Sequence, residues 1–196
     1  MKKSILIAAS TAVMALATPQ AFAQAKSFEG FSVGLNYSSV RTEQTLTTPT
    51  TGISSSVSDG YSNLQAEYIF AINESYVFGI GGTFGLSPLK GATWPSSETF
   101  AKDIYTVDFQ PGYAVSSTTL LYGRLSYSSS TGYSSNGTTT STADASGYGF
   151  GVRQLLTPKF YVQADYTRQK LNERTTGTTV GNGTSNALSL GIGYQF

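Results

Sequence analysis

Five charged residues stand out because each lies on the polar side of a stretch in which apolar and polar residues alternate. They are Glu67, Asp108, Arg124, Arg153 and Asp165. Four of them fall at a similar distance from the nearest predicted short turn, and Arg153 falls nearer to one end. Because a charge removed from water is costly unless it is paired, we expect an interior ionic network in which Asp108 and Arg124 form one salt bridge. The functional alternative to such a plug is a charged gate in a narrow water path.

The residue types that are missing limit the chemistry further. The chain has no histidine and no cysteine, which excludes a Ser-His-Asp triad and a zinc site built from His or Cys ligands. Carboxylate pairs such as Asp103 and Asp108 have the groups for acid–base catalysis, but loop solvation and interior pairing explain them more simply. We therefore expect no enzymatic activity, no cofactor and no metal site.

Strands with two-residue periodicity are the elements that would position these charges. Eight stretches alternate in this way: 31–38, 64–70, 76–84, 105–113, 121–127, 148–153, 160–167 and 188–196. Alternation of this kind indicates strands with one apolar and one polar face, and a tilted strand of roughly 9–11 residues crosses a bilayer. The sequence therefore predicts an all-β fold, an eight-stranded antiparallel up-and-down barrel that spans a membrane.

The connections between these stretches alternate between short and long. The short ones lie at 73–75, 116–118 and 156–159, and the long ones at 41–60, 87–102, 128–146 and 170–185. This pattern is typical of outer-membrane barrels, in which tight turns face the periplasm and longer loops face outward. Pro111 interrupts the fourth stretch beside Gly112, and because proline cannot donate to a strand ladder we expect a β-bulge there.

Aromatic residues on the apolar face gather near the two ends of the predicted strands. One set is Phe31, Phe70, Tyr76, Tyr113, Phe160, Tyr194 and Phe196, and the other is Tyr37, Phe84, Tyr105, Tyr127, Tyr148 and Tyr166. Two such rings at the membrane interfaces are expected of a lipid-facing wall. A soluble periplasmic barrel with an apolar ligand inside would reverse the two faces and would have no reason for these rings.

The N-terminal segment has the features of a secretory signal peptide. Two lysines precede an apolar core from Ile5 to Ala17, and an Ala-Phe-Ala sequence that ends at Ala23 fits the small-x-small cleavage pattern. The apolar core is too short for a single membrane anchor. We expect residues 1–23 to be the signal peptide and residues 24–196 to be the outer-membrane β-barrel domain.

Four segments carry a resemblance to a known family: Leu121–Tyr127, Gly147–Arg153, Thr157–Tyr166 and Ser189–Phe196. They resemble the fifth, sixth, seventh and closing strands of the opacity-protein/OmpA-like family of small outer-membrane β-barrel proteins. Asp165 takes the place of the acidic residue that usually precedes a tyrosine in that family. The resemblance implies that Tyr194 and Phe196 form the terminal assembly signal, and that members act as adhesins, as structural tethers or in roles that are unknown.

These observations lead to an expected location, role and set of partners. We expect a bacterial outer-membrane protein with a structural or surface-interaction, adhesin-like role through its extracellular loops; the alternative is a narrow passive pore for ions or small solutes. The expected partners are outer-membrane lipid and lipopolysaccharide, the outer-membrane barrel assembly machinery, and a host or surface ligand. Without the two lysines of the signal peptide, 10 basic residues remain against 11 acidic ones, so we expect no nucleic-acid binding. We expect a monomer.

Overall fold

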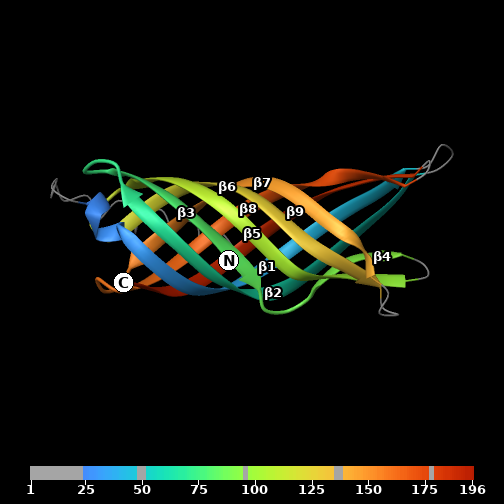
Figure 1. Ribbon diagram of the computed structural model, residues 1–196, viewed down its shortest axis with the longest axis horizontal. Helices are drawn as coiled ribbons and strands as arrows, with labels where there is room; N and C mark the ends of the chain where they lie inside the picture. Colours follow the sequence, from blue (N-terminus) through green and yellow to red (C-terminus); the bar gives the residue numbers. More distant parts are fainter. Residues whose placement is uncertain (1–23, 48–51, 95–96, 135–138, 177–178) are drawn as a thin grey trace, which may run out of the picture.

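The computed structural model describes residues 24–47, 52–94, 97–134, 139–176 and 179–196, which form one elongated β-barrel (Figure 1). The predicted signal peptide, residues 1–23, lies outside the described residues. None of the described helices has the length and apolar character needed to cross a membrane.

Eight strands close the barrel. The elements are η1 (Ala25–Phe28), β1 (Gly30–Thr47), β2 (Gly52–Ala71), β3 (Tyr76–Gly85), β4 (Leu89–Trp94), β5 (Ser97–Ala114), β6 (Thr119–Ser134), β7 (Thr139–Leu155), β8 (Phe160–Thr176) and β9 (Thr179–Gln195). The barrel strands pair antiparallel with their sequence neighbours; β3 pairs with β5, and β1 with β9. β4 pairs with the first part of β5 and stands outside the closed circle. The predicted eight-stranded antiparallel barrel is confirmed.

The three short turns share one construction and define one end of the barrel, called here the inner end. In each turn an early side chain, that of Asn73, Ser116 or Thr157, accepts hydrogen bonds from two backbone N–H groups two and three residues later, over 2.8–3.3 Å. Asn, Ser and Thr favour turns because they make such local bonds. η1 and the C-terminus lie at this same end (Figure 1), which is the periplasmic end of an outer-membrane barrel.

The long connections at the other end, the outer end, are mostly strand rather than loop. The β1–β2 ladder runs from the pair Gly30–Ile69 to the pair Thr47–Gly52, and the β8–β9 ladder from Phe160–Tyr194 to Thr176–Thr179. Apolar alternation did not reveal these extensions because both of their faces are rich in Ser, Thr, Asn and Gly. The barrel wall therefore continues outward as long polar β-hairpins (Figure 1).

The prediction of a bulge at Pro111 is wrong. Phe78 pairs with Pro111, and the β5–β6 register is the same on both sides of the proline. Pro111 has no N–H to donate, but the two strands keep their alignment around it. The register shifts instead between Lys102 and Tyr105, where Asp103 adopts a φ of 51°. Asp enters this left-handed region more readily than bulky residues do, which explains why the irregularity falls there.

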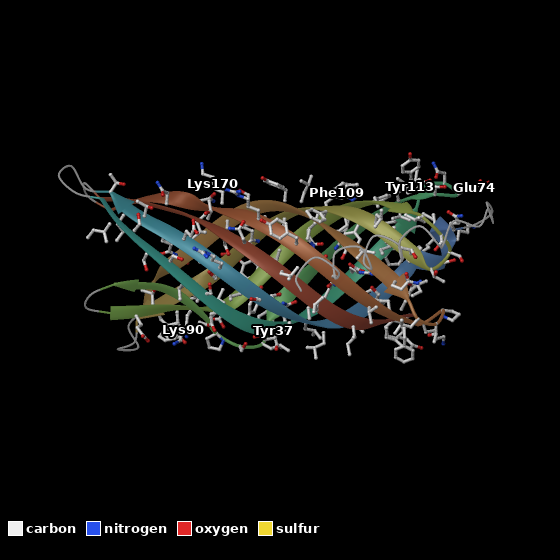
Figure 2. All side chains as sticks on the ribbon, turned by 180° about the vertical axis from the view of Figure 1, so that it is seen from behind. Tyr37, Glu74, Lys90, Phe109, Tyr113 and Lys170 are labelled. Carbon is white, nitrogen blue, oxygen red and sulfur yellow. The ribbon has the colours of Figure 1, made fainter. Side chains whose placement is uncertain are left out.

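The apolar faces of the strands point away from the barrel axis, as predicted. Phe109 and Tyr113 lie at the edge of the barrel in Figure 2, with 42% and 45% of their surfaces exposed. At the inner end, the Phe196 ring lies 5.7 Å from the Phe31 ring and 4.9 Å from the Tyr194 ring, centroid to centroid. An apolar surface of this extent is unfavourable in water and suits the hydrocarbon of a bilayer, with aromatic rings at the interfaces.

Glycines on the inner wall make room for large side chains that cross the lumen. A Cβ atom at Gly193 would overlap the ring of Tyr161, and one at Gly34 would lie 2.8 Å from the Tyr161 hydroxyl. Gly151 faces Tyr122 in the same way, with 2.6 Å between the added Cβ and Cζ of the ring. Each tyrosine therefore occupies space that a side chain on the neighbouring wall would otherwise take.

We expect Gly193→Ala to lower the free energy of unfolding by about 1–3 kcal/mol, the usual cost of overpacking a filled interior. Urea unfolding in lipid vesicles, followed by tyrosine and tryptophan fluorescence, measures this change. Gly52→Ala is the matched control, because nothing lies within 4 Å of a Cβ atom at Gly52. Equal unfolding midpoints for the two variants would contradict the proposed fit between Gly193 and Tyr161.

Candidate functional site

The inner end of the lumen is filled by an apolar plug, and part of it comes from η1. We call this group the inner plug: Ala25, Phe28, Ile69, Val77, Ala114, Leu120, Tyr122, Leu155 and Tyr161. Phe28 is completely buried. Hydrogen bonds hold η1 in the barrel mouth: the Ala25 N–H donates to Glu74 O over 2.9 Å, and Gln195 Nε2 donates to Ser27 O over 2.9 Å.

The sequence analysis did not identify this plug. The sequence did contain an indication of it. Phe28 and Ser32 are both even-numbered, and the alternation places the even-numbered residues of the first strand on the inward face. An aromatic residue at an inward position next to the first strand indicates that the chain turns into the lumen.

The ion pair between Arg153 and Glu67 lies next to the plug, and both side chains are fully buried. The Glu67 carboxylate also accepts three hydrogen bonds: from Ser32 Oγ at 3.0 Å, from Gln65 Nε2 at 2.7 Å and from Gln110 Nε2 at 3.1 Å. Buried charges are tolerated when they are paired and their remaining hydrogen-bonding groups are occupied. Glu67 meets both conditions.

Arg153 is held from two further sides. Its Nη2 donates to Gln163 Oε1 over 2.8 Å, and its guanidinium lies 4.1 Å from the centroid of the Tyr161 ring. A cation over an aromatic face is attracted by the ring quadrupole, more strongly where water is excluded. Arg153 thereby joins the ionic network to the inner plug.

A second ionic group lies on the outer side of the first. Arg124 Nε is 3.4 Å from Asp108 Oδ1, and Arg124 Nη1 is 3.7 Å from Asp165 Oδ1. The Tyr122 hydroxyl donates to Asp165, and Gln110 Nε2 donates to Asp108. The structure thus brings all five predicted charges together, in one group centred on Glu67 and another centred on Arg124. Gln110 bridges the two groups.

Side-chain amides extend the network across the barrel. Gln163 Nε2 donates to Gln65 Oε1 over 2.7 Å and to Asn36 Oδ1 over 3.0 Å, and Asn36 Nδ2 donates to Asn63 Oδ1 over 3.0 Å. The sequence analysis did not assign a role to these glutamines. Their inward position was the available signal, whereas the partners depend on the strand register.

The outer half of the lumen is hollow. It holds a cavity of about 170 Å³ that reaches down to Asn36, Arg124 and Asp165. Its wall is rich in hydroxyl groups, including those of Ser38, Thr42, Ser126, Ser128, Thr167 and Ser189. In the part of the chain that the structure describes, no three Asp or Glu side chains are grouped as ligands for a metal ion.

Comparison with known proteins agrees with this architecture. The family described as "Outer membrane protein beta-barrel domain" matches residues 8–196. Among solved structures, Neisserial surface protein A (NspA) is 19% identical over 86% of this chain and 98% of its own, with a TM-score of 0.56. Curated protein sequences give no significant match.

Two further structures are similar at lower TM-scores. Ail, the attachment invasion locus protein of Yersinia pestis, in complex with the heparin analogue sucrose octasulfate, is 18% identical over 86% of this chain and 99% of its own, with a TM-score of 0.49. OprG from Pseudomonas aeruginosa is 10% identical over 86% and 96%, with a TM-score of 0.48. The barrel is closed, and the family match covers nearly the whole sequence. The chain therefore belongs to the outer membrane protein β-barrel domain family, and its place is the bacterial outer membrane.

Proposed function

We propose that the protein is a surface-interaction barrel, adhesin-like in its action, which acts through its outer β-hairpins and does not conduct solutes. The observation that carries this proposal is the filled inner part of the lumen. The inner plug and the ionic network occupy successive levels of the lumen, and Arg153, Glu67 and Phe28 are buried on all sides. The interior of an eight-stranded barrel is filled by side chains or holds at most one small ligand, so passage of a solute would require both levels to rearrange.

The outer hairpins have the composition of a contact surface. Arg41 and Glu43 form an exposed ion pair near the outer end of β1, and Thr45 shares a hydrogen bond with Ser54 across the β1–β2 hairpin. Lys90 and Lys170 are exposed on different sides of the outer part (Figure 2). Polar hairpins with basic side chains near the outer interface suit contact with lipopolysaccharide phosphates and with a host or surface ligand.

The C-terminal aromatic residues support the proposal that the barrel assembly machinery inserts the protein. Phe196 is 71% exposed at the inner end, beside Tyr194 on the lipid-facing wall. Aromatic side chains often contribute most of the binding energy at protein interfaces, so the exposed rings of the last strand suit recognition by this machinery. We include this machinery, together with outer-membrane lipid, among the proposed partners of a monomeric barrel.

Shortening a hairpin tests the proposed surface role. Glu43 and Ser56 are directly paired, so replacing residues 44–55 with an Asn-Gly turn keeps the strand register. The variant and the wild type are each expressed in a non-adherent bacterial strain, and we expect the variant to give several-fold lower adhesion to cultured epithelial monolayers than the wild type. A variant with residues 44–55 in shuffled order, at the same length, shows whether the sequence of the hairpin matters.

Two measurements complete the test. The shift in gel mobility between boiled and unboiled samples shows that each variant forms the barrel. In planar bilayers, the inserted wild-type protein is expected to give no steady conductance steps. Unchanged adhesion after hairpin shortening would overturn the surface role, and steady steps would favour the narrow pore instead.

A further inference from the structure

Two polar groups beside the outer cavity have no hydrogen-bond partner although they are buried. They are Arg124 Nη2 and Ser126 Oγ. The Arg124 side chain is 10% exposed and Ser126 is 8% exposed. The two residues are two positions apart on β6 and therefore share its inward face, and both line the cavity. Buried polar groups almost always have partners in native proteins, so each exception needs an explanation.

Arg124 differs from the other interior arginine. Arg153 has a close ion pair with Glu67, a hydrogen bond to Gln163, and no place in the cavity lining. Arg124 lies 3.4 and 3.7 Å from its two carboxylate partners, longer than the distances typical of a charge-assisted hydrogen bond. Its guanidinium therefore has donors available to a molecule in the cavity.

The charges at the base of the cavity are paired. Arg124 lies beside Asp108 and Asp165. Lys90 is exposed, and Asp144 hydrogen-bonds to Tyr127 on the outer face of the wall, so hydroxyl, amide and apolar side chains make up the rest of the inward lining, which favours a neutral occupant. The serine and threonine hydroxyls of the wall can each donate and accept, so they suit a molecule that carries several hydroxyl groups of its own. Tyr61, also in the lining, adds a ring against which the C–H groups of such a molecule can pack.

The cavity also limits size and direction of entry. Its volume of about 170 Å³ is below the roughly 300–1,000 Å³ of pockets for drug-sized ligands. The lining continues from Arg124 to Gln44 and Leu171 in the outer hairpins, so the cavity is approached from outside the cell. One ring fits these limits, either as a free molecule or as the end of a longer chain.

We propose that the outer cavity binds a single neutral sugar ring, which is held by Arg124 and Ser126 at its base and by serine and threonine hydroxyls along its wall. The ring comes from a free monosaccharide or from the terminal residue of a glycan. This site goes beyond the surface role of the hairpins and does not depend on it, because the ligand lies within the barrel.

Nuclear magnetic resonance of the refolded mature barrel in dodecylphosphocholine micelles tests the site. This detergent has no sugar headgroup to compete. D-glucose, N-acetyl-D-glucosamine and myo-inositol are titrated separately to about 50 mM, which covers a dissociation constant on the order of 1 mM. We expect saturable shifts of backbone amides in the cavity segments of β6, β8 and β9. Maltotriose distinguishes the sources: shifts with it indicate the end of a glycan, whereas shifts with monosaccharides alone indicate a free sugar.

Variants of two cavity residues give the matched comparison. Ser126→Ala and Thr167→Val each remove one wall hydroxyl, and each is expected to weaken binding about threefold to tenfold, the effect of one hydrogen bond. Ser126→Leu is expected to abolish binding by filling the cavity. Ser146→Ala, which removes a hydroxyl from β7 outside the cavity lining, should leave affinity unchanged.

Three results would overturn the proposal. The first is the absence of saturable shifts with all four sugars and polyols. The second is equal affinity in the wild type and the Ser126→Leu variant. The third is binding of sodium phosphate but of no sugar, which would show an anion site. The gel-mobility shift confirms that each variant is folded, so loss of binding is distinguished from loss of the barrel.

Discussion

Replacing Arg153 with methionine is expected to lower the free energy of unfolding of the barrel by about 3–5 kcal/mol, as when one member of a buried ion pair is removed. Glu67 would stay buried among Ser32, Gln65 and Gln110 without its counter-charge. Methionine keeps most of the volume of the arginine stem, so the loss reports mainly the uncompensated charge. Urea unfolding in lipid vesicles gives the value.

The double variant Glu67→Gln with Arg153→Met is the control for this prediction. It removes both charges, and we expect it to recover much of the loss, because replacing a whole buried pair is often close to neutral. Arg124→Ala is expected to destabilise the barrel less than Arg153→Met, since its ion pairs are longer and its side chain is partly exposed. An unfolding midpoint of Arg153→Met equal to that of the wild type would contradict the proposed ionic network.

Phe28→Ala is expected to lower the free energy of unfolding by about 3–5 kcal/mol, the usual range for removing a buried phenylalanine. The side chain is completely buried in the inner plug, and the remainder of η1 cannot fill the space with Ala25 alone. The same urea experiment measures this loss. Lys26→Ala is the control, because Lys26 is exposed in the same turn and is expected to change stability by less than about 0.5 kcal/mol.

The Phe28→Ala variant also shows which of two levels, the inner plug or the Arg153–Glu67 group, closes the lumen. We expect Phe28→Ala to remain non-conducting in planar bilayers, because the Arg153–Glu67 group still fills the next level. Steady conductance in this variant alone would show that the inner plug is the effective seal. That result would favour the narrow-pore alternative, in which η1 acts as the gate.

The lipid-facing half of the structure could be predicted from the sequence because a bilayer imposes a simple rule on it. Every second residue of a spanning strand must be apolar, so residues such as Leu35 and Ile192 identify both the strand and its outward face. The interface aromatics and the turn residues Asn73 and Ser116 follow equally local rules. These features depend on neighbours in the chain or on the solvent, not on distant contacts.

The inward half was less predictable because its partners come from different strands. The pairing of Glu67 with Arg153 and of Gln163 with Asn36 depends on the stagger of the strands around the barrel. The polar hairpins lacked the apolar signal that bilayer contact produces, so they were predicted as loops. Phe28 lies before the first predicted strand, so its inward position follows only when the alternation is extended back from Ser32.

The closure between β1 and β9 sets the order in which the molecule can form. These strands pair from Ser32–Gln195 to Thr47–Val180, so this seam joins the first and the last strand of the barrel and spans the largest sequence separation among the strand pairs. No such contact exists until the whole chain has been delivered, and contacts of high sequence separation slow folding. Until the last strand arrives, the nascent sheet has two unpaired edges, and such edges can pair with other chains unless they are protected.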